Sequence, residues 1–308
     1  MGIGDTMRFF VTGANGQLGH DVMEELIKRG HEGIGSGTTP VYSDTAGAIA
    51  GLPYVPLDIT DAQETEHVLM DILPDAVIHC AAWTDVDGAE DEENIPRVYE
   101  INAKGTKYVA NACKRLGCKM LYISTDYVFD GSGTEPWHAD CRDYAPLNVY
   151  GRTKLEGELA VSHLLENYFI IRIAWTFGIN GHNFVKTMLN AAQARDSVRV
   201  VDDQIGTPTY TRDLARLLVD MAGTEKYGYY HATNEGGYIS WYDLACEVYR
   251  QAGISTRVVP VSTEEYGYSR AKRPFNSRLD KSALRRNGFA PLPDWKDAVA
   301  RYLRELHQ

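Results

Sequence analysis

The chain has 308 residues, which is enough for one large α/β domain with a smaller appendage or for two modest domains. Hydrophobic residues make up 44% of it and charged residues 24%, and these fractions exclude the disordered and fibrous classes. The formal net charge of -11 is spread along the chain, and Lys and Arg form no run or stripe, so we expect no nucleic acid partner.

The cysteines indicate a reducing compartment. They are odd in number and form no Cys-x-x-Cys pair, which favours free thiols, a cytoplasmic location and no metal cluster. The apolar stretches are too short to span a bilayer and the N-terminus lacks an apolar signal core, so we expect no membrane partner. Residues 1–6 formally match a myristoylation pattern, but we interpret them as a short extension before the first strand.

Apolar segments alternate regularly with segments of helical periodicity up to about residue 174, and one more helix and strand between residues 212 and 231 return to this pattern. The predicted strands are Arg8–Val11, an apolar segment near Tyr54–Leu57, Ala76–Cys80, Met120–Ser124, Tyr168–Ile173 and Gly228–His231. The predicted helices are Asp21–Arg29, Glu64–Leu73, Ile101–Leu116, one that begins near Tyr150, and Arg212–Met221. This alternation predicts an α/β fold with a Rossmann-type, doubly wound parallel sheet.

The regular alternation stops after about residue 174, which predicts a second, smaller lobe of mixed α/β structure. We expect a dinucleotide-binding domain over residues 7–174, with 210–234 returning to the sheet. Residues 175–209 and 235–308 are expected to form a substrate-binding lobe. A cleft between the two parts is the expected ligand site.

A glycine-rich turn, Gly13–Gly19, follows the first strand and opens the first helix. Its glycines Gly13, Gly16 and Gly19 permit a tight turn and a close approach of the backbone to a pyrophosphate, and the helix N-terminus offers unpaired N–H groups. In this position the pattern predicts a bound dinucleotide rather than a merely structural turn.

The stretch Gly33–Thr39, where an acid for the ribose 2′-hydroxyl is expected, carries hydroxyls but neither Asp nor Arg. The cofactor prediction is therefore NADPH, with NADH possible. Asp58 and Ile59 follow the next apolar segment and are expected at the adenine end of the cofactor. An alternative role for Asp58 is that of a helix N-cap.

Tyr150 and Lys154 lie four residues apart, which places both on one face of a helix. A nearby ammonium stabilises a phenolate and lowers the pKa of the tyrosine, which makes a general acid/base for a carbonyl and alcohol couple. Thr125 ends a predicted parallel strand on the ligand side of the sheet and could polarise a substrate carbonyl. The alternative is a hydroxyl that only satisfies turn backbone.

Six segments give the chain a resemblance to the dTDP-4-dehydrorhamnose reductases of the extended short-chain dehydrogenase/reductase family. They are Cys80–Asp87, Ser124–Gly131, Pro146–Glu156, Arg172–Gly178, Asp203–Thr209 and Arg273–Asp280. The resemblance runs from about Met7 to the C-terminus, and several of these strings are specific to this branch of the fold.

The resemblance implies reduction of the 4-keto group of dTDP-4-dehydro-β-L-rhamnose to dTDP-L-rhamnose by hydride transfer from NAD(P)H. Tyr150 would donate the proton, Lys154 would anchor the nicotinamide ribose, and Thr125 would orient the keto oxygen. The other implied cofactor residues are Gly16, Gln17, Leu18, Ala81, Ala82, Trp83, Thr84 and Asn102. The implied substrate residues are Asp126, Trp175, Arg273 and Asn276, although a lone Trp is more often part of a core and an Arg more often on the surface.

Two other functions remain open. A nucleotide-sugar epimerase or dehydratase shares the fold, but a dehydratase of this type needs a second acid where Tyr127 follows Asp126 here. A noncatalytic regulatory subunit, resembling the β-subunit of methionine adenosyltransferase, is the alternative from another class, because a fold does not settle a function. We expect a monomer or a homodimer with a nucleotide-sugar substrate.

Overall fold

The computed structural model describes residues 6–43, 47, 49–267 and 269–306. Most of the myristoylation-like pattern at residues 1–6 lies outside these residues. The strands of the main sheet are β1 (Arg8–Thr12), β2 (Glu32–Gly37), β3 (Tyr54–Pro56), β4 (Ala76–His79), β5 (Lys119–Thr125), β6 (Tyr168–Ile173) and β11 (Gly228–His231). They pair in the order β11-β6-β5-β4-β1-β2-β3, and every pairing is parallel. The predicted Rossmann-type sheet is confirmed.

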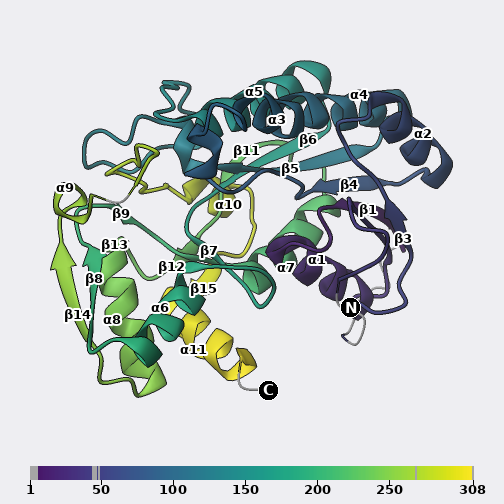
Figure 1. The fold of residues 1–308 in the computed structure, drawn as a ribbon. Coiled ribbons are helices and arrows are strands. Elements are labelled where there is room, and N and C mark those ends of the chain that lie inside the picture. Colours follow the sequence, from purple (N-terminus) through teal and green to yellow (C-terminus); the bar gives the residue numbers. More distant parts are fainter. Residues whose placement is uncertain (1–5, 44–46, 48, 268, 307–308) are drawn as a thin grey trace.

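Helices cover both faces of this sheet (Figure 1). On one face lie α1 (Gln17–Lys28) and α7 (Thr211–Ala222), and on the other lie α2 (Ala62–Ile72), α4 (Thr106–Leu116) and α5 (Val149–Leu164). Successive strand residues serve opposite cores, because side chains alternate across a strand. Phe9 and Val11 belong to the core under α1 and α7, whereas Phe10 belongs to the core under α2, α4 and α5.

Three local differences from the sequence prediction have physical reasons. Strand β2 was not predicted, because its glycines break the apolar run, yet a Cβ on Gly33 or Gly35 would meet Met23 or Tyr42. Helix α1 begins earlier than predicted, directly after its N-cap residue Gly16. The predicted helix over residues 101–116 is continuous with α3 (Ile95–Tyr99) through a π-helical segment, η2 (Glu100–Gly105), before α4.

Beyond β6, the chain builds a further core in a second lobe, from residues of α6 (Phe184–Ala194), α8 (Trp241–Ala252) and α11 (Trp295–Leu306) together with two strands. Those strands, β8 (Ser197–Val201) and β14 (Arg257–Val261), form a parallel pair. The remaining elements are short: η1 (Gly88–Glu90), η3 (Asp126–Val128), β7 (Thr176–Phe177), β9 (Ile205–Gly206), β10 (Thr209–Tyr210), β12 (Asn234–Glu235), β13 (Ile239–Ser240), α9 (Thr263–Tyr266), α10 (Ser282–Arg286) and β15 (Leu292–Asp294). A smaller mixed α/β lobe is confirmed.

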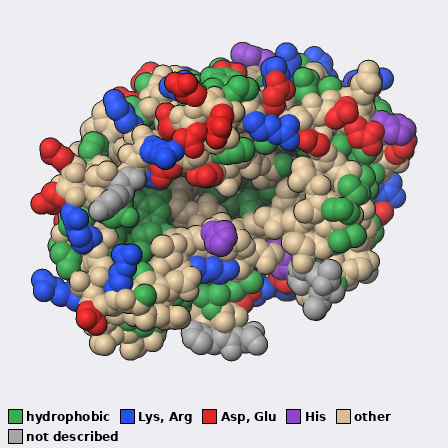
Figure 2. All heavy atoms as spheres, in the orientation of Figure 1, with side chains coloured by type: hydrophobic (Ala, Val, Ile, Leu, Met, Phe, Trp, Pro, Cys, Tyr) green, Lys and Arg blue, Asp and Glu red, His purple; other side chains and the backbone are tan. Residues whose placement is uncertain are grey.

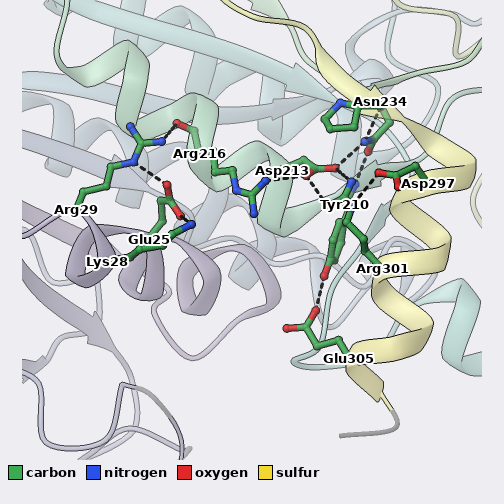
Figure 3. Close-up of polar contacts among 11 residues, drawn as sticks. Glu25, Lys28, Arg29, Tyr210, Asp213, Arg216, Asn234, Asp297, Arg301 and Glu305 are labelled. Carbon is green, nitrogen blue, oxygen red and sulfur yellow. Dashed lines mark hydrogen bonds and ion pairs between the residues drawn. The ribbon is translucent and has the colours of Figure 1, made fainter. Parts of the chain in front are cut away.

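Polar contacts join α7 of the sheet layer to α1 and to α11 (Figure 3). The guanidinium of Arg301 on α11 donates to both carboxylate oxygens of Asp213 on α7, at 2.7 Å each, and Asn234 donates to the same carboxylate at 2.9 Å. On α1, Arg29 binds Glu25 at 2.6 Å and also reaches Asp220 of α7. Because the Asp213 side chain is fully buried, this contact holds the two parts at a fixed separation.

Among the described residues, no helix combines the length and the apolar character that crossing a bilayer requires.

Candidate active site

A cavity of about 790 Å³ opens above the carboxyl ends of β1, β2, β4, β5 and β6 and is closed on its far side by residues of the second lobe. Figure 2 shows the molecule hollowed between the sheet layer and this lobe, with hydrophobic side chains on the walls. In open α/β sheets ligands bind at the carboxyl ends of strands. The cavity is therefore the candidate active site.

Most of the predicted site residues line this cavity. They are Gly13, Gly16, Gln17, Leu18, Gly19, Asp58, Ile59, Ala81, Ala82, Thr84, Thr125, Asp126, Tyr150, Lys154, Trp175 and Arg273. The residues Trp83, Asn102 and Asn276 do not line it. Sequence reasoning missed other lining residues, above all Arg97, His182, Phe184 and Trp241.

The glycine turn is shaped so that only glycine fits. Gly13 has a φ of +68°, and a Cβ there would lie 2.7 Å from the backbone nitrogen of Ala81. A Cβ on Gly19 would lie 2.2 Å from the carbonyl oxygen of Gly13. Gly16 is the N-cap of α1 and has no side chain to accept from the first N–H groups of the helix, so these groups can donate to a ligand. This arrangement fits an anionic group such as a pyrophosphate.

At the end of the cavity where the adenine is predicted, Asp58 is held by Arg97 rather than capping a helix. The Arg97 guanidinium lies 2.7 Å from its carboxylate, and Thr60 donates to it from the hydroxyl at 2.8 Å. Burial alone would raise the pKa of Asp58, but these hydrogen bonds outweigh it and lower that pKa. The N-cap of α2 is Asp61, so the alternative role for Asp58 is wrong. Arg97 also brings a cation to a region where the local sequence showed none.

The predicted acid/base pair lies on α5, whose N-cap Asn148 accepts from the backbone of Gly151 at 2.7 Å. Lys154 is 3% exposed, donates to the carbonyl of Ile123 at 2.6 Å, and lies 4.2 Å above the ring of Tyr122. Burial lowers the pKa of Lys154 from its ordinary 10.5 to about 7, although the Glu158 carboxylate acts in the opposite direction. The lysine is therefore half charged near neutral pH.

Tyr150 differs from the expectation. Burial first, and the Asp126 carboxylate second, raise the pKa of Tyr150, and a hydrogen bond with Thr125 lowers it only in part. The expected lowering of this pKa by Lys154 is thus wrong for this arrangement, because the ammonium is directed to the carbonyl of Ile123. A neutral phenol is nevertheless the form needed to donate a proton.

Asp126 is buried and carries an incompletely bonded carboxylate. One oxygen, Oδ1, accepts from the Thr125 hydroxyl at 3.1 Å, while Oδ2 has no hydrogen-bond partner among the described residues. Burial raises the pKa of Asp126 to about 6, with the neighbouring hydroxyls of Ser277 and Thr125 opposing the shift. A buried acceptor left open in a cavity is suited to a ligand hydroxyl.

Asn102 supports the site from behind. Its amide accepts from the backbone of Trp83 at 2.8 Å and donates to the Thr153 hydroxyl at 3.0 Å. These bonds connect the loop after β4 to α5 next to Lys154. The cavity is therefore built on Trp83 and Asn102 without being lined by them.

Aromatic side chains form the wall on the side of the second lobe. Trp175 stacks on Trp241 with ring centroids 3.9 Å apart, and Phe184 packs against Trp241 at 4.7 Å. Trp175 has a φ of +52°, which is rare for a bulky residue and marks a position that the surroundings enforce. A Cβ on Gly206 would lie 2.9 Å from the Trp175 ring, so only glycine fits at this position of β9, next to the indole.

The two predicted substrate residues of the segment Arg273–Asp280 lie in different surroundings. Arg273 reaches the cavity and pairs with Asp87 at 2.8 Å. Asn276 is 2% exposed and donates to the carbonyls of Ser132 and Glu135, at 3.1 and 2.8 Å. Asn276 therefore fixes a loop instead of facing the cavity.

One group of side chains in the described ranges has the composition of a metal site, namely His20, Asp21 and Glu24 on α1. It does not line the cavity. Thr211 donates to the Asp21 carboxylate and Arg212 pairs with Glu24, so both acids also serve the contact between α1 and α7.

Comparison with known proteins agrees with this geometry. Residues 7–308 match the family model described as the RmlD substrate binding domain. A dTDP-4-dehydrorhamnose reductase of Streptomyces griseus is 39% identical over 298 residues, covering 95% of this chain and 91% of that protein. The crystal structure of a dTDP-4-dehydrorhamnose reductase from Bacillus anthracis in complex with NADP is 39% identical with a TM-score of 0.84, covering 98% of this chain and 100% of that one. The crystal structure of a dTDP-4-dehydrorhamnose reductase from Clostridium acetobutylicum is 37% identical with a TM-score of 0.85, covering 98% of this chain and 100% of that one.

Proposed function

We propose that this chain, which belongs to the family of the RmlD substrate binding domain, reduces the 4-keto group of dTDP-4-dehydro-β-L-rhamnose to give dTDP-L-rhamnose. The observation that carries the proposal is the convergence of Thr125, Tyr150 and Lys154 on the cavity that also holds the glycine turn. Relatives at 33–39% identity over most of the chain carry the name of this reductase.

The residues present fit a dinucleotide. The glycine cradle at Gly13, Gly16 and Gly19 accepts a pyrophosphate, and Asp58 with Ile59 lines the adenine end. When bound, NAD(P)H supplies the hydride. We propose NADPH as the main reductant, with NADH as an alternative, because the end of β2 carries Ser36, Thr38 and Thr39 without an acid and Arg97 lies at the same end of the cavity.

Each reacting residue has a role that its position supports. Tyr150, neutral at physiological pH, donates its phenolic proton to the developing alkoxide of the substrate. The Thr125 hydroxyl, which donates to Asp126 at 3.1 Å, would turn its single proton to the same oxygen, and Lys154 binds the ribose hydroxyls next to it. Asp126, Trp175 and Arg273 are placed to hold the substrate, since they line the cavity beyond these residues. Asn102 acts by positioning the loop and α5.

We also propose that the two parts of the fold bind different ligands. Residues 7–174 with 210–234 bind the cofactor, and residues 175–209 with 235–308 bind the nucleotide sugar. A cytoplasmic location and a monomeric or homodimeric state stay predictions.

The test is oxidation of NADPH and of NADH, followed at 340 nm with dTDP-4-dehydro-β-L-rhamnose as substrate. We expect turnover by the parent and a loss of about 10²- to 10⁴-fold in kcat for Tyr150→Phe, the usual contribution of a general acid. Tyr249→Phe is the matched control, because it removes a buried hydrogen bond to Met188, 2.8 Å long, away from the cavity. A Tyr150→Phe variant with parental kcat would contradict the proposal.

The two alternatives predict different results. An epimerase or a dehydratase would convert the nucleotide sugar without net oxidation of added NADPH, and product analysis would show it. A regulatory subunit would show no turnover with either reductant, and it would bind a synthetase partner instead.

A further inference from the structure

A fully buried ion pair lies beneath the reacting residues, and the proposed mechanism does not use it. Glu158 and Arg172 both have side chains with no solvent exposure. The guanidinium of Arg172 donates from Nε to Oε1 and from Nη2 to Oε2 of Glu158, at 2.8 Å each. Replacing such a pair by apolar residues is often neutral or stabilising, so stability alone does not account for it.

The pair is attached to the backbone that presents the catalytic groups. Glu158 lies one turn after Lys154 on α5, and Arg172 on β6 is in register with Ser124 on β5. The Ser124 hydroxyl donates to Glu158 at 2.5 Å. Ser124 directly precedes Thr125 and directly follows Ile123, whose carbonyl accepts from Lys154 at 2.6 Å. The carboxylate thus fixes the strand end on which both Thr125 and Lys154 depend.

We propose that Glu158, clamped by Arg172 and Ser124, is a positioning residue that supplies the negative charge acting on Lys154 and holds the end of β5 in place for reduction. Arg172 orients this carboxylate through its two hydrogen bonds. Its guanidinium is itself held, because it donates to the Tyr144 hydroxyl at 3.0 Å and to the carbonyl of Ala139 at 3.4 Å, and it lies 3.4 Å from the ring of His231.

The other titratable groups around Lys154 carry no compensating charge. On β4 and just after it, burial lowers the pKa of His79 to about 3 and raises that of Cys80 to about 12, so both are neutral at pH 7. On β5, burial raises the pKa of Tyr122, and on α5 the same effect keeps Tyr150 neutral. Asp126 on η3 acts on Tyr150. Glu158 is the carboxylate that raises the pKa of Lys154 against its burial.

The inference rests on the proposed function, since it assigns Lys154 a role in its charged form. Removing the charge of Glu158 should make Lys154 lose its proton at lower pH, so reduction and NADPH binding should both fail at lower pH. The expected displacement is about one pH unit, the lower end of the effect of an opposite charge at short range. A residue with only a structural role would lower the rate equally at every pH.

The experiment compares the parent with Glu158→Gln and with the double variant Glu158→Gln/Arg172→Met. Gln keeps the shape of Glu and can still accept from Ser124, and the double variant leaves no unpaired buried guanidinium if the single variant fails to fold. Asp213→Asn is the matched control, because it breaks another buried carboxylate pair, with Arg301, far from Lys154. Two profiles are recorded between pH 5 and 10: kcat/KM for the keto sugar, and the Kd for NADPH by fluorescence.

We expect the alkaline fall of both profiles to move to lower pH in the Glu158 variants and to stay in place in Asp213→Asn. If the alkaline fall of both profiles stays at its parental pH in both Glu158 variants, the inference is overturned, whereas the proposed reductase function is unaffected. If the parent shows no turnover, the proposed function fails, and the NADPH profile still decides whether Glu158 acts on Lys154.

Discussion

Lys154 is expected to reduce the stability of the fold that it serves, and Lys154→Met is the test. Lowering its pKa from 10.5 to about 7 corresponds to a cost of about 5 kcal/mol for burying the ammonium at or below neutral pH, at about 1.4 kcal/mol per unit. Met gives up the hydrogen bond to the Ile123 carbonyl, a loss of about 1.5–3 kcal/mol. Met retains the apolar stem over the ring of Tyr122, so we expect the variant to be more stable by about 2–3.5 kcal/mol at pH 7.

The pH dependence gives this prediction its sign. A lysine whose pKa is lower in the folded state releases its proton on folding, so between about pH 7 and 10.5 the unfolded chain binds more protons. The stability of the parent therefore rises by about 1.4 kcal/mol per pH unit in this window, so the advantage of Lys154→Met shrinks and disappears between about pH 8.5 and 9.5. Urea unfolding at pH 6.5, 8 and 9.5 measures this, with Tyr150→Phe as a control that retains the lysine. A variant less stable than the parent at pH 6.5, or a difference that does not change with pH, would refute the reasoning.

Two further substitutions test the cradle and the aromatic wall. Gly19→Ala puts a Cβ 2.2 Å from the backbone oxygen of Gly13, which cannot move aside as a side chain could, so we expect a loss of about 1–3 kcal/mol in urea unfolding and weaker NADPH binding. Gly223→Ala is its control, with a φ of -71° and 3.5 Å of space, and equal losses in the two variants would contradict the clash. Trp241→Ala removes the stacking partner of Trp175, so we expect the KM for the keto sugar to rise about tenfold with an unchanged Kd for NADPH. An unchanged KM would show that Trp175 holds its position without that partner.

The sequence was sufficient for features that depend on local pattern. The alternation of apolar and helical segments predicted six strands of the seven-stranded sheet, and the Tyr150–Lys154 spacing predicted a shared helix face. Strand β2 escaped because Glu32–Gly37 is rich in glycine and has no apolar run. Gly33 faces Met23 of α1 and Gly35 faces Tyr42, and these are tertiary contacts that no local pattern encodes.

The cavity residues that were not predicted lie outside the sequence segments that resemble the family. Phe184 and Trp241 each begin a helix of the second lobe, and Trp241 meets both Phe184 and Trp175 only in the folded chain. Arg97 reaches the cavity from α3, where nothing in the local sequence distinguishes it from a surface arginine. Asn276 shows the opposite failure, because a residue inside a recognisable motif turned out to bind loop carbonyls.

Burial is the common cause of the unusual chemistry at the carboxyl edge of the sheet. It moves the pKa of Lys154 down to about 7 and that of Asp126 up to about 6, so an acid and a base of ordinarily distant pKa both titrate near neutrality. The same burial keeps Tyr150 protonated until a ligand accepts its proton. Trp175, Trp241 and Phe184 line the same cavity as these groups. Residues of both parts of the chain therefore surround the place where we propose that the proton moves.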